Sequence, residues 1–114
     1  MIADDHETYR QGLARAIRRF GRLDLVGEAV DGDEALEIVR EASPDVALLD
    51  VRMPGLDGLE VARRLRELGG VHVVLLTGSA TESLVEAAEA AGVRALLSKD
   101  LARDEICRRL LDLP

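Results

Sequence analysis

The sequence has few of the residues that serve disulfide bonding, aromatic packing or membrane insertion. Tryptophan is absent and the two aromatic residues are Tyr9 and Phe20, so the core has to be built from aliphatic side chains. The single cysteine, Cys107, cannot form a disulfide within the chain, which suits a reducing cytoplasm. There is no apolar run of membrane-spanning length and no charged-then-apolar leader, so we expect a cytoplasmic domain without membrane association.

Basic residues are also in deficit. The chain has 15 Lys and Arg against 22 Asp and Glu, which gives a formal net charge of −7. Binding to nucleic-acid phosphates needs a positive surplus that displaces counterions, so this charge argues against direct nucleic-acid contact by the segment. A length of 114 residues, of which 47% are hydrophobic and 32% charged, fits one globular domain with one core.

Asp50 is the most informative residue of the sequence. It closes the short apolar run 46–49, which predicts a strand buried on both faces. Asp4 and Asp5 close the first apolar segment, residues 1–3, in the same way. In an open α/β sheet, ligands bind and reactions occur beyond the C-terminal ends of the strands. Three carboxylates at two such ends therefore predict a bound cation or a reaction at this edge of the sheet.

Short apolar segments alternate with segments of helical periodicity along the chain. We predict strands over residues 1–3, 25–30, 46–50, 71–76 and 93–97. We predict helices over residues 8–20, from the turn at 31–33 to Pro44, 58–68 (capped by Asp57), 81–91 and 102–112. Five βα units in a row imply a parallel sheet with helices on both faces. We expect a weak first strand, because it is so short, and a second strand at a sheet edge, because Gly27 and Glu28 interrupt it.

The motifs at the ends of four predicted strands together resemble the receiver domain of two-component response regulators. These motifs are Asp4-Asp5, Asp50 with Met53-Pro54-Gly55-Leu56-Asp57-Gly58, Thr77 and Lys99. The resemblance covers the whole chain, residues 1–114, and implies a flavodoxin-like (βα)5 doubly wound parallel sheet with strand order 2-1-3-4-5. It implies a signalling domain rather than an enzyme, phosphorylated on Asp50 by a sensor histidine kinase.

The resemblance also implies a magnesium site beside the phosphoacceptor. Asp5 and Asp50, Asp4 through a water molecule, and the backbone carbonyl of Arg52 are the expected ligands of one Mg²⁺. Magnesium prefers a few carboxylates together with waters and phosphate oxygens, and this set of ligands matches that preference. The alternative for Asp4 and Asp5 is that they are solvated loop acids that cap the first helix.

Thr77 and Lys99 complete the expected site. The resemblance implies that Lys99 pairs with the phosphoryl oxygens of Asp50 and that the Thr77 hydroxyl moves to donate a hydrogen bond to one of them. Each residue has a plainer explanation if taken alone, Thr77 as the end of a strand and Lys99 as an ordinary surface lysine.

Residues 2–6 and the pair Lys99-Asp100 most resemble regulators that carry a LuxR-type helix-turn-helix domain after the receiver. We therefore expect control of transcription through a DNA-binding domain that lies beyond residue 114. Regulators of this group often form dimers. The expected surfaces are the first and last helices, or the face made by the fourth helix, the fifth strand and the last helix.

The sequence departs from the family pattern at several positions. Leu96 stands where most receivers have a Tyr or Phe that swings inward on activation, which removes that reporter from the switch. Asp100 follows the lysine where proline is frequent, so we expect a trans peptide bond there. Arg52 and Ser79 occupy the positions that tune hydrolysis, and neither is a good general base. We therefore expect a phosphoryl group that lasts minutes or longer.

Two other functions stay open at this stage. A receiver fold that binds partners regardless of phosphorylation is favoured by the short first strand and by Leu96. A haloacid-type phosphatase with an aspartyl nucleophile needs a second acid close after Asp50, and Arg52 stands at that place. His6 and His72 are isolated in the sequence, so we assign neither to a metal.

Overall fold

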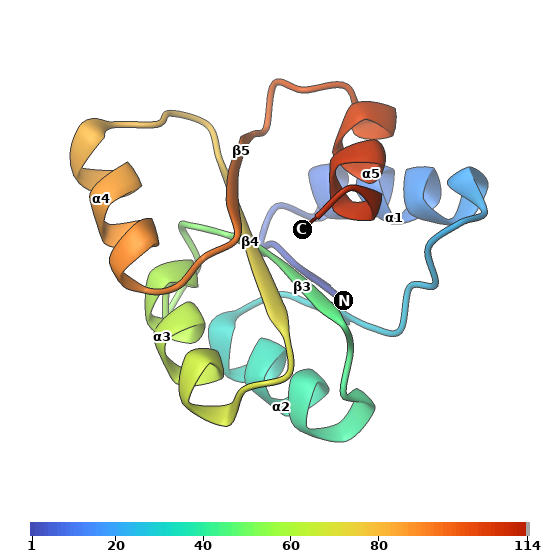
Figure 1. Cartoon of the computed structure of the whole chain (residues 1–114). Helices are drawn as coiled ribbons and strands as arrows, with labels where there is room; N and C mark the ends of the chain where they lie inside the picture. The colour runs from blue at the N-terminus through green and yellow to red at the C-terminus, as the bar shows by residue number, and fades with distance from the viewer. Residues whose placement is uncertain (114) are drawn as a thin grey trace.

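One sheet of five parallel strands forms the centre of the molecule, in the order β2-β1-β3-β4-β5 that the sequence predicted (Figure 1). The computed structural model describes residues 1–113; the predicted domain end at residue 114 lies outside this range. The strands are β1 (Ile2–Ala3), β2 (Glu28–Ala29), β3 (Val46–Asp50), β4 (His72–Thr77) and β5 (Ala95–Ser98). The helices are α1 (Glu7–Phe20), α2 (Gly32–Ala42), α3 (Gly58–Leu68), α4 (Glu82–Ala90) and α5 (Arg103–Leu111).

The helices cover both faces of the sheet and divide the core into two clusters. Helices α1 and α5 lie on one face, and α2, α3 and α4 lie on the other (Figure 1). Because side chains alternate along a strand, β3 contributes Ala47 and Leu49 to the cluster under α2, α3 and α4 and Leu48 to the cluster under α1 and α5. All three are at most 1% exposed, which confirms the predicted strand with two buried faces.

The local signals that start and stop the helices act as predicted. The Asp57 side chain caps α3 by accepting a hydrogen bond from the backbone N–H of Glu60 at 2.9 Å. Asp31 caps α2 in the same way, through the N–H of Glu34 at 2.8 Å. Gly21 ends α1 with a φ of 75°, which a residue without a Cβ adopts at no steric cost. These caps fix where the strands re-enter the sheet.

The edge of the sheet next to β1 is shorter than predicted. The second strand spans two residues, Glu28 and Ala29, instead of 25–30. The register of the strand pair explains the difference. Ile2 pairs with Glu28 and Ala3 with Ala29, so residues 25–27 lie before the stretch that is paired with β1. The expectations of a weak first strand and of an edge position for β2 are confirmed. Within the described range, no helix is long and apolar enough to cross a membrane.

Candidate functional site

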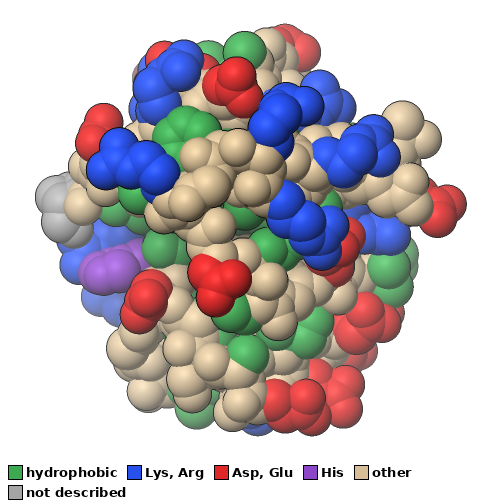
Figure 2. All heavy atoms as spheres, turned by 90° about the vertical axis from the view of Figure 1, so that its right-hand side faces the viewer, with side chains coloured by type: hydrophobic (Ala, Val, Ile, Leu, Met, Phe, Trp, Pro, Cys, Tyr) green, Lys and Arg blue, Asp and Glu red, His purple; other side chains and the backbone are tan. Residues whose placement is uncertain are grey.

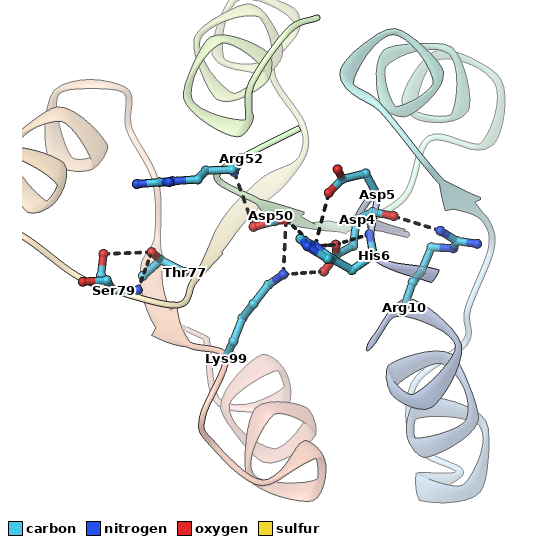
Figure 3. Close-up of polar contacts among 9 residues, drawn as sticks. All are labelled: Asp4, Asp5, His6, Arg10, Asp50, Arg52, Thr77, Ser79 and Lys99. Carbon is cyan, nitrogen blue, oxygen red and sulfur yellow. Dashed lines mark hydrogen bonds and ion pairs between the residues drawn. The ribbon is translucent and has the colours of Figure 1, made fainter. Parts of the chain in front are cut away.

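The strand register brings four of the predicted site residues to one level at the C-terminal edge of the sheet. Ala3 pairs with Leu49, so Asp4 follows beside Asp50. Asp50 pairs with Leu76 and Thr77 pairs with Ser98, so Thr77 and Lys99 come next along the same edge. Figure 3 shows these side chains around one crevice, reached from the ends of β1, β3, β4 and β5. The fold therefore assembles the site from residues that are far apart in the sequence.

Asp4 and Asp50 are buried carboxylates that share one cation. They are 3% and 4% exposed, and the Lys99 ammonium lies 2.8 Å from Asp4 Oδ2 and 3.2 Å from Asp50 Oδ2. Both Oδ2 atoms lack a directed hydrogen-bond partner among the described residues, so the ammonium neutralises them as a nearby charge. Because two buried negative charges face one positive charge, the crevice carries an excess of negative charge.

Burial and the neighbouring charges shift the pKa values of Asp50 and Lys99. The pKa of Asp50 is raised, because burial disfavours the charged carboxylate and the Asp4 charge repels it, and Lys99 offsets these effects only in part. Burial works against the charged form of Lys99, but its contacts with Asp4 and Asp50 outweigh that effect and raise the pKa of Lys99. The lysine is therefore firmly protonated, whereas Asp50 ionises less readily than an exposed aspartate.

His6 belongs to this cluster, contrary to its isolated position in the sequence. Its Nδ1 lies 3.2 Å from Asp4 Oδ1, 3.3 Å from Asp5 Oδ1 and 3.8 Å from Asp50 Oδ2. The prediction that His6 is unclustered is wrong, because the chain turns into α1 directly after the acids and folds the imidazole back over them (Figure 3). His72 belongs to no such group within residues 1–113.

The loop after β3 shapes the crevice beside Asp50. The backbone N–H of Arg52 points to Asp50 Oδ1 at 3.4 Å, and the Arg52 side chain extends away from the acids (Figure 3). The Gly58 N–H donates to the Val51 carbonyl at 2.9 Å. A Cβ on Gly58 would overlap the Asp50 carbonyl oxygen and lie 3.1 Å from the Val51 Cα, so only glycine fits this approach.

Thr77 lines an open cavity of ≈ 300 Å³ next to Asp50, but its hydroxyl is engaged elsewhere. The Thr77 hydroxyl donates to the Ser79 carbonyl at 3.0 Å and accepts from the Ser79 N–H at 3.1 Å. Figure 3 shows both bonds on the side away from Asp50. A hydrogen bond from Thr77 to a group on Asp50 therefore requires a change of this local turn.

Tyr9 is a neighbour of the site that the sequence did not reveal. The Lys99 ammonium lies 4.7 Å from the centroid of the Tyr9 ring, and the Arg103 guanidinium lies 5.1 Å from the same centroid. From the sequence, Tyr9 is a residue of the inward face of α1; nothing in its spacing points to Lys99. The ring therefore lies beside the ammonium group that pairs with the two acids.

The crevice brings together side chains that are candidate ligands of a divalent cation. Carboxylate oxygens of Asp4, Asp5 and Asp50 approach one another, two of the buried oxygens lack hydrogen-bond donors, and the cavity beside them is open. An acidic crevice with a lysine and a hydroxyl, at the edge of a doubly wound sheet where such folds bind ligands, is the arrangement that the resemblance to receiver domains predicted.

The comparison with known families agrees with this resemblance. The family model of the response regulator receiver domain matches residues 1–111, and the chain belongs to this family. “Probable transcriptional regulatory protein NarL” of Mycobacterium tuberculosis is 41% identical over 113 residues, which cover 98% of this chain and 52% of that protein. The transcriptional regulatory protein LiaR of Bacillus subtilis is 36% identical over 107 residues, or 93% of this chain and 51% of LiaR. The chain thus spans about half the length of these relatives.

Solved structures give the same result. The signal receiver domain of NarL from Mycobacterium tuberculosis matches with a TM-score of 0.94 at 41% identity, covering 97% of this chain and 90% of that chain. A DNA-binding response regulator of the LuxR family from Staphylococcus aureus matches with a TM-score of 0.91 at 27% identity, covering 96% of this chain and 92% of that chain. The predicted resemblance to receiver domains of LuxR-type regulators is confirmed.

Proposed function

We propose that Asp50 is the phosphoacceptor of this receiver domain and that a sensor histidine kinase supplies the phosphoryl group. One observation carries the proposal: a buried carboxylate at the end of β3 has an oxygen without a directed hydrogen bond, next to a lysine and facing an open cavity. A capping or surface aspartate has no need of this arrangement. We further propose that the phosphorylated domain controls transcription through an attached DNA-binding domain, as its relatives' names suggest.

The transfer follows from the position of Asp50. A carboxylate oxygen attacks the phosphorus of a phosphohistidine on the kinase, and the new O–P bond forms as the P–N bond breaks. The histidine nitrogen keeps the bonding electron pair and takes up a proton. The product on Asp50 is an acyl phosphate, in which the negative charge of the carboxylate is replaced by a phosphoryl group that carries a charge of about −1.5 to −2 and strong acceptor oxygens.

The residues around Asp50 fit a magnesium ion. Asp4, Asp5 and Asp50 offer oxygen atoms close to one another, and the backbone carbonyl of Arg52 is the proposed fourth protein ligand. The buried oxygens without hydrogen-bond donors are the observation that favours a cation here. When bound, such an ion neutralises the charge that develops on the phosphoryl oxygens. Lys99 supplies positive charge from the opposite side and is drawn from Asp4 toward the new phosphoryl group.

The proposed switch runs through Thr77. Its hydroxyl leaves Ser79 and donates to a phosphoryl oxygen, which pulls on the loop before α4. Leu96 packs against the hydrophobic cluster beneath α4, so no aromatic side chain is available there to report this movement. We expect a switch of small amplitude on this side, and a phosphoryl lifetime of minutes or longer because Arg52 and Ser79 offer no general base.

Dimerisation through α1 and α5 is part of the proposal. Arg19 of α1 and Asp104 of α5 form an ion pair at 3.9 Å, and further arginines of both helices are exposed. Figure 2, which views the side where α1 lies in Figure 1, shows basic and acidic side chains mixed over the surface. Such a surface suits complementary pairing between two copies, and it lacks the continuous basic area that nucleic acids require. The face of α4, β5 and α5 is the alternative dimer surface.

Acetyl phosphate with Mg²⁺ tests the phosphoacceptor directly. We expect the intact mass of the wild-type protein to rise by one phosphoryl group and the mass of Asp50→Asn to stay unchanged. Asp45→Asn is the matched control, because Asp45 is exposed at the other end of the same strand and should leave the gain intact. A mass gain that persists in Asp50→Asn contradicts the assignment.

An interaction module that acts without phosphate is the second candidate. The engagement of the Thr77 hydroxyl by Ser79 and the presence of Leu96 favour it. No mass gain in a folded wild-type sample, together with partner binding unaffected by Asp50→Asn, would support this candidate. Sustained hydrolysis of a phosphate ester would instead indicate an enzyme.

A further inference from the structure

His6 adds a nitrogen donor to the acidic crevice. It precedes the first residue of α1, yet its side chain makes no capping hydrogen bond and is 69% exposed. The ring turns instead toward three carboxylates, and Nδ1 lies 3.2 Å, 3.3 Å and 3.8 Å from oxygens of Asp4, Asp5 and Asp50 (Figure 3). One donor atom from each of these four residues lies within 4.8 Å of all the others.

The separations from His6 Nδ1 are close to those of ligands around one small divalent ion. Zinc binds histidine nitrogen and carboxylate oxygen at about 2.0–2.2 Å, so tetrahedral ligand atoms lie about 3.3–3.6 Å apart. The distances from His6 Nδ1 to Asp4 and Asp5 reach this range within about 0.1 Å, and the distance to Asp50 exceeds it by a few tenths of an ångström. Other pairs among the four donor atoms lie up to 4.8 Å apart, so binding of such an ion requires the side chains to close around it.

A second observation independently points to a ligand in this space. Asp4 Oδ2 and Asp50 Oδ2 are buried acceptors without a hydrogen-bond donor among the described residues, on side chains that are 4% and 5% exposed. The one nearby lysine serves both acids at once. The interior of the crevice therefore holds two buried acids that share a single cation, while His6 covers the same acids from the solvent side.

The imidazole changes which ion such a crevice prefers. Magnesium takes carboxylate, carbonyl and water oxygens, whereas an imidazole nitrogen suits zinc and its neighbours in the first transition row. We propose that His6 is a metal ligand and that, together with Asp4, Asp5 and Asp50, it makes the crevice a site for a borderline transition ion that binds tighter than Mg²⁺. The regulatory consequence, which rests on the proposed function, is that such an ion competes with magnesium and blocks phosphorylation of Asp50.

Calorimetric titration with Zn²⁺ and with Mg²⁺ tests the ligand role. We expect wild type to bind Zn²⁺ tighter than Mg²⁺, and His6→Asn to lose at least about tenfold in Zn²⁺ affinity. The Mg²⁺ affinity should stay within about twofold, because magnesium does not depend on imidazole. Asparagine is a good residue at a helix N-terminus, so His6→Asn should fold. His72→Asn, at the start of β4 and outside the cluster, is the matched control and should bind both ions as wild type does.

Two results overturn the proposal: equal Zn²⁺ affinity in wild type and His6→Asn, or Zn²⁺ binding in wild type no tighter than Mg²⁺ binding. In either case the ring makes only an ordinary hydrogen bond with the acids. The regulatory step is tested by adding Zn²⁺ to the acetyl phosphate reaction, where it should suppress the mass gain more strongly in wild type than in His6→Asn. The gain with Mg²⁺ alone reports on the phosphoacceptor, so failure of that function is seen separately from failure of the zinc site.

Discussion

Replacing Lys99 with methionine should destabilise the domain strongly, because it leaves two buried carboxylates without their cation. Methionine keeps an unbranched apolar stem, so the substitution removes mainly the charge. The ammonium lies 2.8 Å and 3.2 Å from the two carboxylates, which are almost fully buried. The effect should therefore differ from that of a surface ion pair.

The expected loss of stability can be estimated from the burial of the two ion pairs. At an effective dielectric constant near 20, each contact contributes about 5 kcal/mol of attraction before the cost of burying the charges. Removing one partner of a buried pair costs about 3–5 kcal/mol in well-studied cases. Lys99 keeps a side chain that is 16% exposed, and water can reach the crevice past His6, so we expect a loss of about 2–4 kcal/mol.

Urea unfolding followed by far-UV circular dichroism, at pH 7.5 with a chelator, measures this loss. Arg63→Met is the matched control, because the Arg63–Glu60 pair has the same 3.2 Å separation but is largely exposed. Its loss should stay below about 0.5 kcal/mol. Adding Asp50→Asn to Lys99→Met should recover at least about 1 kcal/mol, because one of the two unpaired acids is removed. A Lys99→Met protein as stable as wild type, or no recovery in the double variant, refutes the reasoning.

Three further outcomes are expected. The raised pKa of Asp50 means that the folded state binds a proton at this residue more readily than the unfolded chain does. The free energy of unfolding of the wild type should therefore fall as the pH rises from 3.8 through that raised pKa, and urea unfolding should show the stability advantage of Asp50→Asn growing over this interval. A stability advantage that is independent of pH contradicts the assignment. Tyr9 is the sole tyrosine in a chain without tryptophan, so its emission should change when phosphorylation draws Lys99 from its ring, and the same emission before and after phosphorylation argues against that movement. Gly58→Ala should destabilise by about 1–3 kcal/mol in urea unfolding because its Cβ meets the backbone of β3, whereas Gly78→Ala, which meets nothing, should be close to neutral.

The sequence predicted the order of elements and the strand topology because its signals are local and consistent. Apolar runs, helical periodicity and caps such as Asp57 are set by neighbouring residues, and the right-handed βα connection then limits the topology. The length of β2 could not be predicted in this way. Leu25 and Val26 have suitable side chains, but a strand forms only where a partner strand lies beside it, and β1 begins pairing at Ile2.

Part of the site could also be predicted from local signals in the sequence. Asp4, Asp50, Thr77 and Lys99 follow strands, and parallel strands end on one edge, so their meeting follows from the fold. The role of His6 could not be found this way, because the direction of a side chain at the start of a helix depends on how the loop turns. The assignments of phosphoacceptor, magnesium ligands and switch residue stay predictions, as does a cytoplasmic location.

Lys99 is the only lysine of the sequence, and the structure holds its amino group between two carboxylates. Reagents that acylate side-chain amines therefore have one target in this chain, and they can reach it only when the ion pair separates. The rate of acylation at this position becomes a direct gauge of how often the crevice opens. An acyl group, once attached, removes the lysine charge and leaves the two acids without a counter-charge.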